Sequence, residues 1–173
     1  MLAKLYLGIV TISPVSLLML IYFAAPLFSQ AELHFNQYLT EKLESLGYQV
    51  FLPQRDGAER DKPPYDKMTK EERRFAIFQV DTTHIMESDI FLFVLDGRVP
   101  DEGACVELGV AYTHKKLQHR NKLIIGLHTD IRAAFIGSKL NPMIRVPLEY
   151  IATTEKELLQ VLRDYQDCQV ITD

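Results

Sequence analysis

The chain has 173 residues, of which 47% are hydrophobic, so its length and composition suit one domain with a substantial core. Its formal net charge of −4 provides no excess of basic residues, and we therefore do not expect nucleic acid as a partner. The two cysteines, Cys105 and Cys168, form no CxxC motif and no Cys/His cluster, which argues against structural zinc and favours a cytoplasmic location.

The amino-terminal region has alternative interpretations. Residues 5–28 carry no charge and are long enough to cross a bilayer, so a membrane anchor or a cleaved signal peptide stays open. Pro14 and Pro26 interrupt this stretch, however, and an α/β domain needs residues 18–24 as its first central strand. We therefore expect residues 1–17 to be an apolar extension, such as a start codon assigned too early produces, and residues 18–173 to form the domain.

The next segments predict a helix, a strand and a long loop. The helix has apolar residues at the spacing of one helical face and ends at Gly47. Residues 48–52 have the apolar character of a second strand, and residues 53–68, rich in charge and proline, predict a loop. The apolar positions of the helix are Phe35, Leu39, Leu43 and Leu46.

The remaining segments continue the alternation of helices and strands. Thr69 and Glu72 have capping-box spacing, which predicts a helix to about residue 86 with Phe75, Phe78 and Ile85 facing inward. In chain order we then expect a strand at 90–95, a helix at 103–116, a strand at 122–127, an irregular or short-helical segment at 129–145, a strand at 150–152, and a helix capped by Thr154 and carrying Leu158, Leu159, Leu162 and Tyr165. This order predicts a single-domain α/β fold: a doubly wound, flavodoxin-like or Rossmann-like parallel sheet of five strands with helices on both faces.

Glu107 is the most informative candidate residue, because it follows the strand at 90–95 and lies at the start of a helix. Ligands of open α/β sheets bind outside the carboxyl ends of the strands. A helix amino terminus favours anions, so we expect Glu107 to stay ionised and available as a nucleophile. Taken singly, the candidates also have simpler interpretations: Tyr22 as core packing, Asp81 as a solvated helix residue, and Glu107 as a complement to the helix dipole.

The order and spacing of these residues resemble the nucleoside 2-deoxyribosyltransferase family from residue 20 to residue 165. The matching segments are an aromatic-bearing first strand at 21–28, Asp81 eight residues before Asp89, an Asp-x-Gly-x-x-x-Glu-x-Gly signature at 101–109, Thr-Asp-x-Arg at 129–132 and Asn-x-Met at 141–143. One departure is the loop at 24–27, which lacks the glycine of many relatives.

The resemblance implies that the nucleobase of a 2′-deoxyribonucleoside is exchanged for a free nucleobase, with retention at C1′. Glu107 would attack C1′ and form a covalent ester, as in a retaining glycosidase. Asp101 and Asp81 would bind the leaving base and transfer its proton. Tyr22 would orient Glu107, and Phe28 would stack on the base.

Three further positions carry expectations. Gly103, within the signature, would contact the substrate, and Gln54 is a weaker candidate for the base, with a surface loop as its alternative. Asn141 would reach into the site of a neighbouring subunit, which implies a homo-oligomer built from dimers, up to a hexamer. We expect no metal and no cofactor, since the chain has no GxGxxG, no GxxxxGK[ST] and no metal-ligand spacing.

Two rival functions stay open. The nearest is a 2′-deoxynucleoside 5′-monophosphate N-glycosidase, which uses a similar glutamate with water as acceptor; asparagine rather than serine at position 141 weakly disfavours it. The other is a nucleoside-binding module without turnover. A membrane partner is not expected.

Overall fold

The computed structural model describes residues 18–58, 61–118, 121–132 and 140–172. The predicted extension at 1–17 lies outside these residues. Within the described ranges, every helix is too short or too polar to cross a membrane.

The core of the molecule is a sheet of five parallel strands in the order β2-β1-β3-β4-β5. This is a doubly wound order of the flavodoxin type, and it confirms the predicted fold class. The chain direction across the sheet reverses between β1 and β3, so the carboxyl ends of these two strands form the topological switch point. The strands are β1 (Leu20–Ala24), β2 (Gln49–Phe51), β3 (Ile90–Val94), β4 (Leu123–Leu127) and β5 (Tyr150–Ala152).

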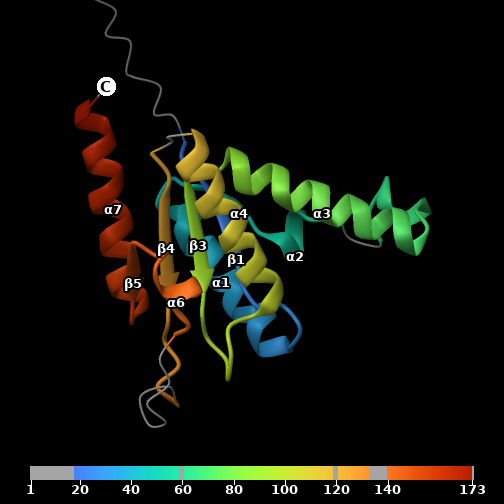
Figure 1. The fold of residues 1–173 in the computed structure, drawn as a ribbon, viewed down its shortest axis with the longest axis horizontal. Coiled ribbons are helices and arrows are strands. Elements are labelled where there is room, and N and C mark those ends of the chain that lie inside the picture. The colour runs from blue at the N-terminus through green and yellow to red at the C-terminus, as the bar shows by residue number, and fades with distance from the viewer. Residues whose placement is uncertain (1–17, 59–60, 119–120, 133–139, 173) are drawn as a thin grey trace, which may run out of the picture.

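Helices cover both faces of this sheet (Figure 1). The helices α1 (Gln30–Ser45) and α7 (Glu155–Thr172) pack on one face, and α3 (Lys70–Glu87) and α4 (Glu102–Gln118) pack on the other. Side chains alternate along each strand, so Ile21 and Phe23 contribute to the core under α1 and α7 while Tyr22 contributes to the opposite core.

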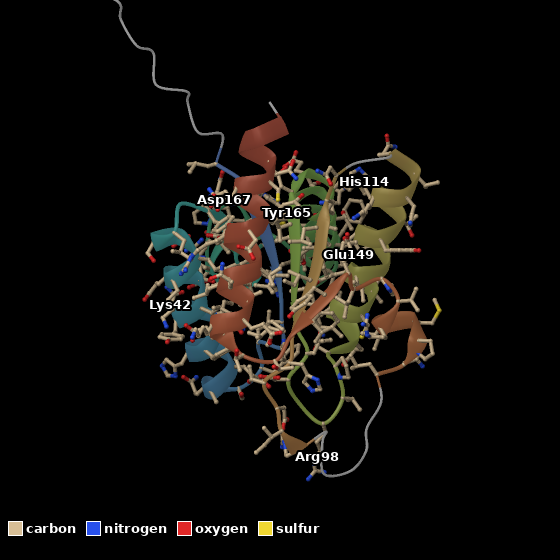
Figure 2. All side chains as sticks on the ribbon, turned by 90° about the vertical axis from the view of Figure 1, so that its left-hand side faces the viewer. Lys42, Arg98, His114, Glu149, Tyr165 and Asp167 are labelled. Carbon is tan, nitrogen blue, oxygen red and sulfur yellow. The ribbon has the colours of Figure 1, made fainter. Side chains whose placement is uncertain are left out.

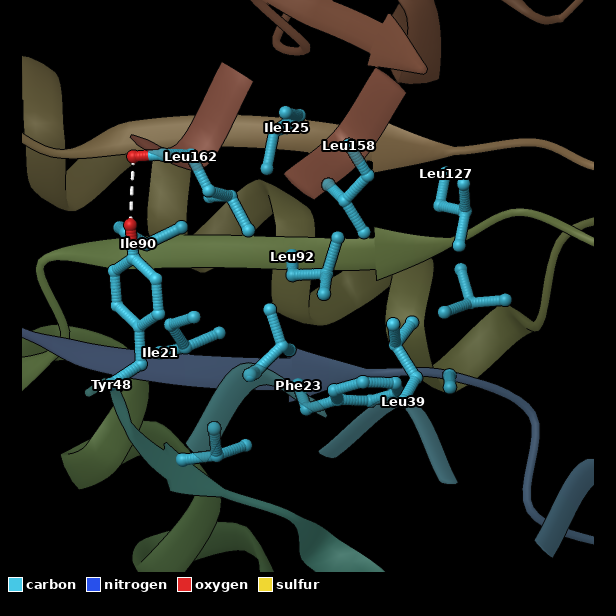
Figure 3. Packing of buried hydrophobic residues seen from close by; sticks show 14 of the residues in the cluster. Ile21, Phe23, Leu39, Tyr48, Ile90, Leu92, Ile125, Leu127, Leu158 and Leu162 are labelled. Carbon is cyan, nitrogen blue, oxygen red and sulfur yellow. Dashed lines mark hydrogen bonds between the residues drawn. The ribbon is translucent and has the colours of Figure 1, made fainter. Parts of the chain in front are cut away.

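The core under α1 and α7 is mainly apolar and contains one buried tyrosine hydroxyl (Figure 3). The hydroxyl of Tyr48 donates to the carbonyl oxygen of Leu162 at 2.7 Å, which satisfies a buried phenol. At the surface, Lys42 of α1 forms an ion pair with Glu155 at the start of α7; Figure 2 labels Lys42 beside that helix. These contacts join the two helices of this face.

Several predicted helix boundaries are confirmed by their caps. Thr69 and Glu72 form the predicted capping box of α3. Gly47 follows the last turn of α1 with φ of 90°, a left-handed conformation that glycine adopts without strain. The region predicted as a loop at 53–68 contains two short elements, α2 (Pro53–Asp56) and a 3₁₀ turn, η1 (Tyr65–Lys67), and the segment before β5 contains the short helix α6 (Pro142–Arg145).

The predicted inward position of two aromatic residues of α3 is wrong. Phe75 is 63% exposed and Phe78 is 60% exposed, whereas Ile85 is buried as expected. The reason is that the amino-terminal half of α3 extends beyond the edge of the sheet (Figure 1), so only its carboxyl-terminal half has a core to face.

A buried lysine fixes the carboxyl end of α3 to the sheet. Lys122, immediately before β4, is 1% exposed, and its ammonium donates to the carbonyl oxygen of Ile85 at 2.6 Å and to the hydroxyl of Ser88 at 2.7 Å. It also donates to the carbonyl oxygen of Ser88. A cation there satisfies the last carbonyl groups of the helix and complements its dipole.

Candidate active site

A cavity of about 330 Å³ lies outside the carboxyl ends of β1 and β3, at the switch point of the sheet. Its volume suits a small organic ligand. Four segments contribute lining residues: the loop after β1, the end of β2 with α2, one face of α3, and the start of α4. These residues are Ala25, Leu27, Phe28, Pro53, Gly57, Ala58, Arg73, Ile77, Asp81, Asp101, Gly103 and Glu107.

The three carboxylates predicted from the sequence meet in this cavity. Asp81 comes from α3, while Asp101 and Glu107 come from the start of α4. Asp101 also caps α4, because its Oδ1 accepts a hydrogen bond from the backbone N–H of Ala104 at 2.9 Å. Within the described residues, no group of three His, Cys, Asp or Glu side chains is placed to hold a metal ion.

Gly103 leaves room for the Asp101 carboxylate. A Cβ atom at position 103 would lie 3.2 Å from Asp101 Oδ1, which is tighter than an ordinary van der Waals contact. Glycine is unfavourable inside a helix, so its presence in the first turns of α4 has a local steric reason. The carboxylate can therefore cap the helix and face the cavity at once.

Glu107 differs from expectation in its ionisation. Burial raises its pKa from the usual 4.5 to about 7; the hydrogen bond from Tyr22 acts in the opposite direction, and the charges of Asp81 and Asp101 raise the pKa further. The sequence interpretation relied on the helix dipole, whose influence falls off within the first turn. Glu107 is five residues beyond the start of α4, so burial outweighs the dipole.

Tyr22 is fixed in a stack of aromatic rings. Its ring is fully buried between Phe51 and Phe91, with centroids 5.6 and 5.7 Å apart and nearly parallel planes. His84 of α3 in turn stacks on Phe51, with centroids 3.8 Å apart. Phe51 and Phe91 therefore hold the phenol in one orientation.

The hydroxyl of Tyr22 faces Glu107 and has no fully formed hydrogen bond within the described structure. It is nevertheless close enough to Glu107 to lower the pKa of that carboxyl. The pKa of Tyr22 itself lies far above its usual value, because of burial first and of the Glu107 and Asp81 charges next. Tyr22 is therefore a neutral donor available to the Glu107 carboxylate.

The other predicted residues take different places. Phe28 is 78% exposed at the edge of the cavity that it lines. Gln54 binds to α1 instead, since its amide donates to the carbonyl oxygen of Leu33 at 2.9 Å and accepts from Asn36 at 3.0 Å. Asn141 is exposed and caps α6. Neither Gln54 nor Asn141 belongs to the described lining of this cavity.

Two lining residues of α3 were not expected from the sequence. Arg73 and Ile77 lie eight and four residues before Asp81, so all three are on one face of the helix. This spacing was the available signal, because a helix that places Asp81 in a site also places residues one and two turns before it along the same wall. The Arg73 guanidinium makes no hydrogen bond or ion pair within the described part of the chain.

A second groove of about 320 Å³ runs between α3 and α4 on the outer side of the same carboxylates. It shares Asp81 and Glu107 with the cavity, and its apolar lining includes Phe78 and Val106, which are 60% and 64% exposed. An apolar surface thus adjoins the candidate site.

Comparisons with known proteins give one family. The family model described as nucleoside 2-deoxyribosyltransferase matches residues 21–159, a span that includes every predicted site residue from Tyr22 to Asn141. No curated protein matches the chain.

The similar solved structures include three that differ in description. A conserved protein from Enterococcus faecalis V583 has 28% identity and a TM-score of 0.64, with 86% of this chain and 99% of that chain covered. A 2-deoxyribosyltransferase from the psychrotolerant bacterium Bacillus psychrosaccharolyticus has 24% identity and a TM-score of 0.64, with 80% and 89% covered. A CMP N-glycosidase from Clostridium botulinum has 22% identity and a TM-score of 0.47, with 84% and 98% covered, a likeness too loose to bear on function.

Proposed function

From the premise that this chain belongs to the nucleoside 2-deoxyribosyltransferase family, we propose that it transfers a 2-deoxyribosyl group from one nucleobase to another. The observation that carries the proposal is the position of Glu107, which lines a cavity together with Asp81 and Asp101 and has the Tyr22 hydroxyl beside it. A double displacement at an anomeric carbon uses one carboxylate as the nucleophile and a neighbouring carboxyl group for proton transfer, and this cavity contains both. The substrates would be 2′-deoxyribonucleosides and free nucleobases.

The first displacement would use Glu107 as nucleophile. A carboxylate oxygen of Glu107 forms a bond to C1′ while the bond from C1′ to the base nitrogen breaks, and the electron pair of that bond goes to the base. Asp101 and Asp81 supply the proton that the departing base needs. In the second displacement a nitrogen of another base attacks C1′, the bond from C1′ to Glu107 breaks with its electron pair returning to the carboxylate, and the N–H proton of the incoming base passes to Asp101 or Asp81. Two inversions retain the configuration at C1′.

Tyr22 would act on Glu107 rather than on the sugar. A neutral hydroxyl held rigidly next to the carboxyl group favours its ionised form and fixes the oxygen that attacks. Burial has the opposite effect on ionisation and makes the carboxylate more basic. Together, burial and the Tyr22 hydroxyl give Glu107 a pKa of about 7.

Base exchange is the direct test. Deoxyinosine and free adenine should yield deoxyadenosine and hypoxanthine, and Glu107→Ala should abolish this conversion. Glu102→Ala is the matched control, since Glu102 is an exposed carboxylate of the same helix outside the cavity lining, and it should keep full activity. Release of free sugar without exchange, or hydrolysis confined to 5′-monophosphates, would instead establish the N-glycosidase, and saturable binding without turnover would establish a binding module.

A homo-oligomer with shared sites is part of the proposal. It is supported by the exposed apolar side chains of the adjoining groove, Phe78 and Val106, and by the position of Asn141 outside its own chain's cavity. Mixing inactive Glu107→Ala subunits with inactive Asn141→Ala subunits should restore part of the activity, because mixed dimers contain one intact composite site. Absence of any recovery in mixtures shown to exchange subunits would contradict a shared site.

A further inference from the structure

We infer that Arg73 selects among nucleobases, favouring those with a carbonyl oxygen at the edge remote from the glycosidic bond, the 6-oxopurines and 4-oxopyrimidines, over their 6-amino and 4-amino counterparts. The inference rests on the proposed function, because it names the class of base that the same cavity takes. Arg73 would be a specificity-determining residue, separate from the groups that break the glycosidic bond.

The placement of Arg73 along α3 is the first support. Arg73, Ile77 and Asp81 line the cavity at one-turn intervals, so the backbone of Arg73 lies two turns, roughly 12 Å along the helix axis, before that of Asp81. Side chains on a helix lean toward its amino terminus, which carries Arg73 further outward. The cavity wall therefore runs from a carboxylate at its inner end, through an apolar residue, to a cation at its outer end.

The bonding state of Arg73 is the second support. Several other arginines of the described chain are paired: Arg55 with Glu44 and Asp56, and Arg74 with Glu71. Arg73 is only partly exposed, lines the ligand cavity, and makes no such pair among the described residues. No described residue therefore competes with a bound molecule for its donors.

The ends of the cavity fix which part of a substrate faces Arg73. The sugar carbon must lie at Glu107, and the base nitrogen that leaves must lie next to Asp81 and Asp101. The body of the base then lies along Ile77, whose apolar side chain can pack against an aromatic ring. Its far edge points toward the guanidinium.

The chemistry of that edge decides the preference. A guanidinium carries only hydrogen-bond donors, and it pairs well with the carbonyl edge of an oxo base. An amino group at the same position presents donors to donors, so the guanidinium stays unpaired and loses its hydration for no gain. A two-donor contact of this kind discriminates between bases by about tenfold or more.

A competition between two acceptors tests the inference. With deoxyuridine as donor and equal concentrations of hypoxanthine and adenine, the wild-type protein should form deoxyinosine over deoxyadenosine by about tenfold, and Arg73→Ala should bring the ratio close to one. Arg73→Lys should keep part of the preference. Lys70→Ala, which removes an exposed cation from the same helix outside the lining, should leave the ratio unchanged. Because the ratio is internal, it does not depend on how much of each variant is folded.

Equilibrium binding separates this inference from the proposed function. If no exchange occurs with any base, calorimetric titration with hypoxanthine and with adenine still decides: a selective loss of about tenfold in hypoxanthine affinity in Arg73→Ala supports the inference. An unchanged hypoxanthine-to-adenine ratio, in exchange or in binding, overturns it, as does a failure to bind either base. A loss confined to deoxyinosine 5′-monophosphate relative to deoxyinosine would assign the guanidinium to a phosphate and overturn it as well.

Discussion

Replacement of Tyr22 by phenylalanine should move the acid limb of the pH–rate profile upward without weakening the fold. The pKa of Glu107 is about 7, so about one molecule in ten carries the nucleophilic carboxylate at pH 6 and about nine in ten at pH 8. The nucleophile must be ionised, hence kcat/KM of the wild-type protein should rise about tenfold between these pH values and then level off.

The size of the shift follows from the lost hydrogen bond. A hydrogen bond to a charged group contributes about 1.5 to 3 kcal/mol, and the Tyr22 contact, not fully formed in the structure, belongs at or below the lower end. At 1.36 kcal/mol per pKa unit, the midpoint of the limb should move up by about one pH unit. Activity at pH 7 should then fall about fivefold through ionisation alone, and most of it should return by pH 9.

The fold of this variant should be intact. Phenylalanine keeps the stack with Phe51 and Phe91, and it removes a buried hydroxyl that lacks a fully formed hydrogen bond, so the free energy of unfolding should be unchanged or higher by up to about 1 kcal/mol. Tyr48→Phe is the matched control. It removes a buried hydroxyl that does have a partner, so it should lower the free energy of unfolding by about 1 kcal/mol and leave the pH midpoint in place.

The assay is kcat/KM for base exchange from pH 5.5 to pH 9, with chemical denaturation run in parallel. A rate reduced by the same factor at every pH, with an unmoved midpoint, would refute the reasoning, because Tyr22 would then act without affecting the ionisation of Glu107.

Three further outcomes follow from the site and its surroundings. The folded-state pKa of Glu107 lies above its usual 4.5, so the wild-type protein should lose stability as pH rises from 4.5 through 7. Compared with the wild-type protein, Glu107→Gln should be more stable by about 1 to 2 kcal/mol at pH 8 and equally stable at pH 4.5, as measured by urea unfolding. Gly103→Ala should change the free energy of unfolding by no more than about 1 kcal/mol, since the gain from alanine in the helix is offset by the strained Asp101 cap, yet it should lower exchange activity about tenfold by displacing the Asp101 carboxylate. Unchanged exchange activity would contradict this. Phe78→Asp places a charge in the apolar groove between α3 and α4, so it should shift sedimentation toward a smaller species. An unchanged sedimentation coefficient would show that this groove is not part of the subunit interface.

The strands and helix boundaries were predictable because their signals are local. The continuous apolar runs of β3 and β4 are typical of strands buried on both faces, and the Thr69 capping box gave the start of α3. The placement of Asp101 and Glu107 at the site was also predictable, because strand ends and helix starts of a parallel sheet converge at one edge. Asp81 lies within α3, and only the family resemblance predicted that it would join them.

What could not be predicted depends on how far each element extends. Helical spacing identifies the apolar positions of α3 but does not say that Phe75 and Phe78 lie beyond the sheet. The raised pKa of Glu107 comes from burial by segments distant in sequence, which outweighs the local helix dipole. The attachment of Gln54 to α1 likewise depends on tertiary contact.

The anchoring of α3 at one end only has a consequence for how such a protein can change over evolution. Lys122 binds the carboxyl end of the helix to the sheet by hydrogen bonds, which fixes the position of Asp81 relative to the strands. Residues 70–78, by contrast, extend beyond the core (Figure 1). Substitutions on that free half cost little stability, because few of its side chains are buried. On the proposed roles, base preference can therefore change by substitutions in that half while Asp81 keeps its place, whereas a substitution of Lys122 would displace the whole helix.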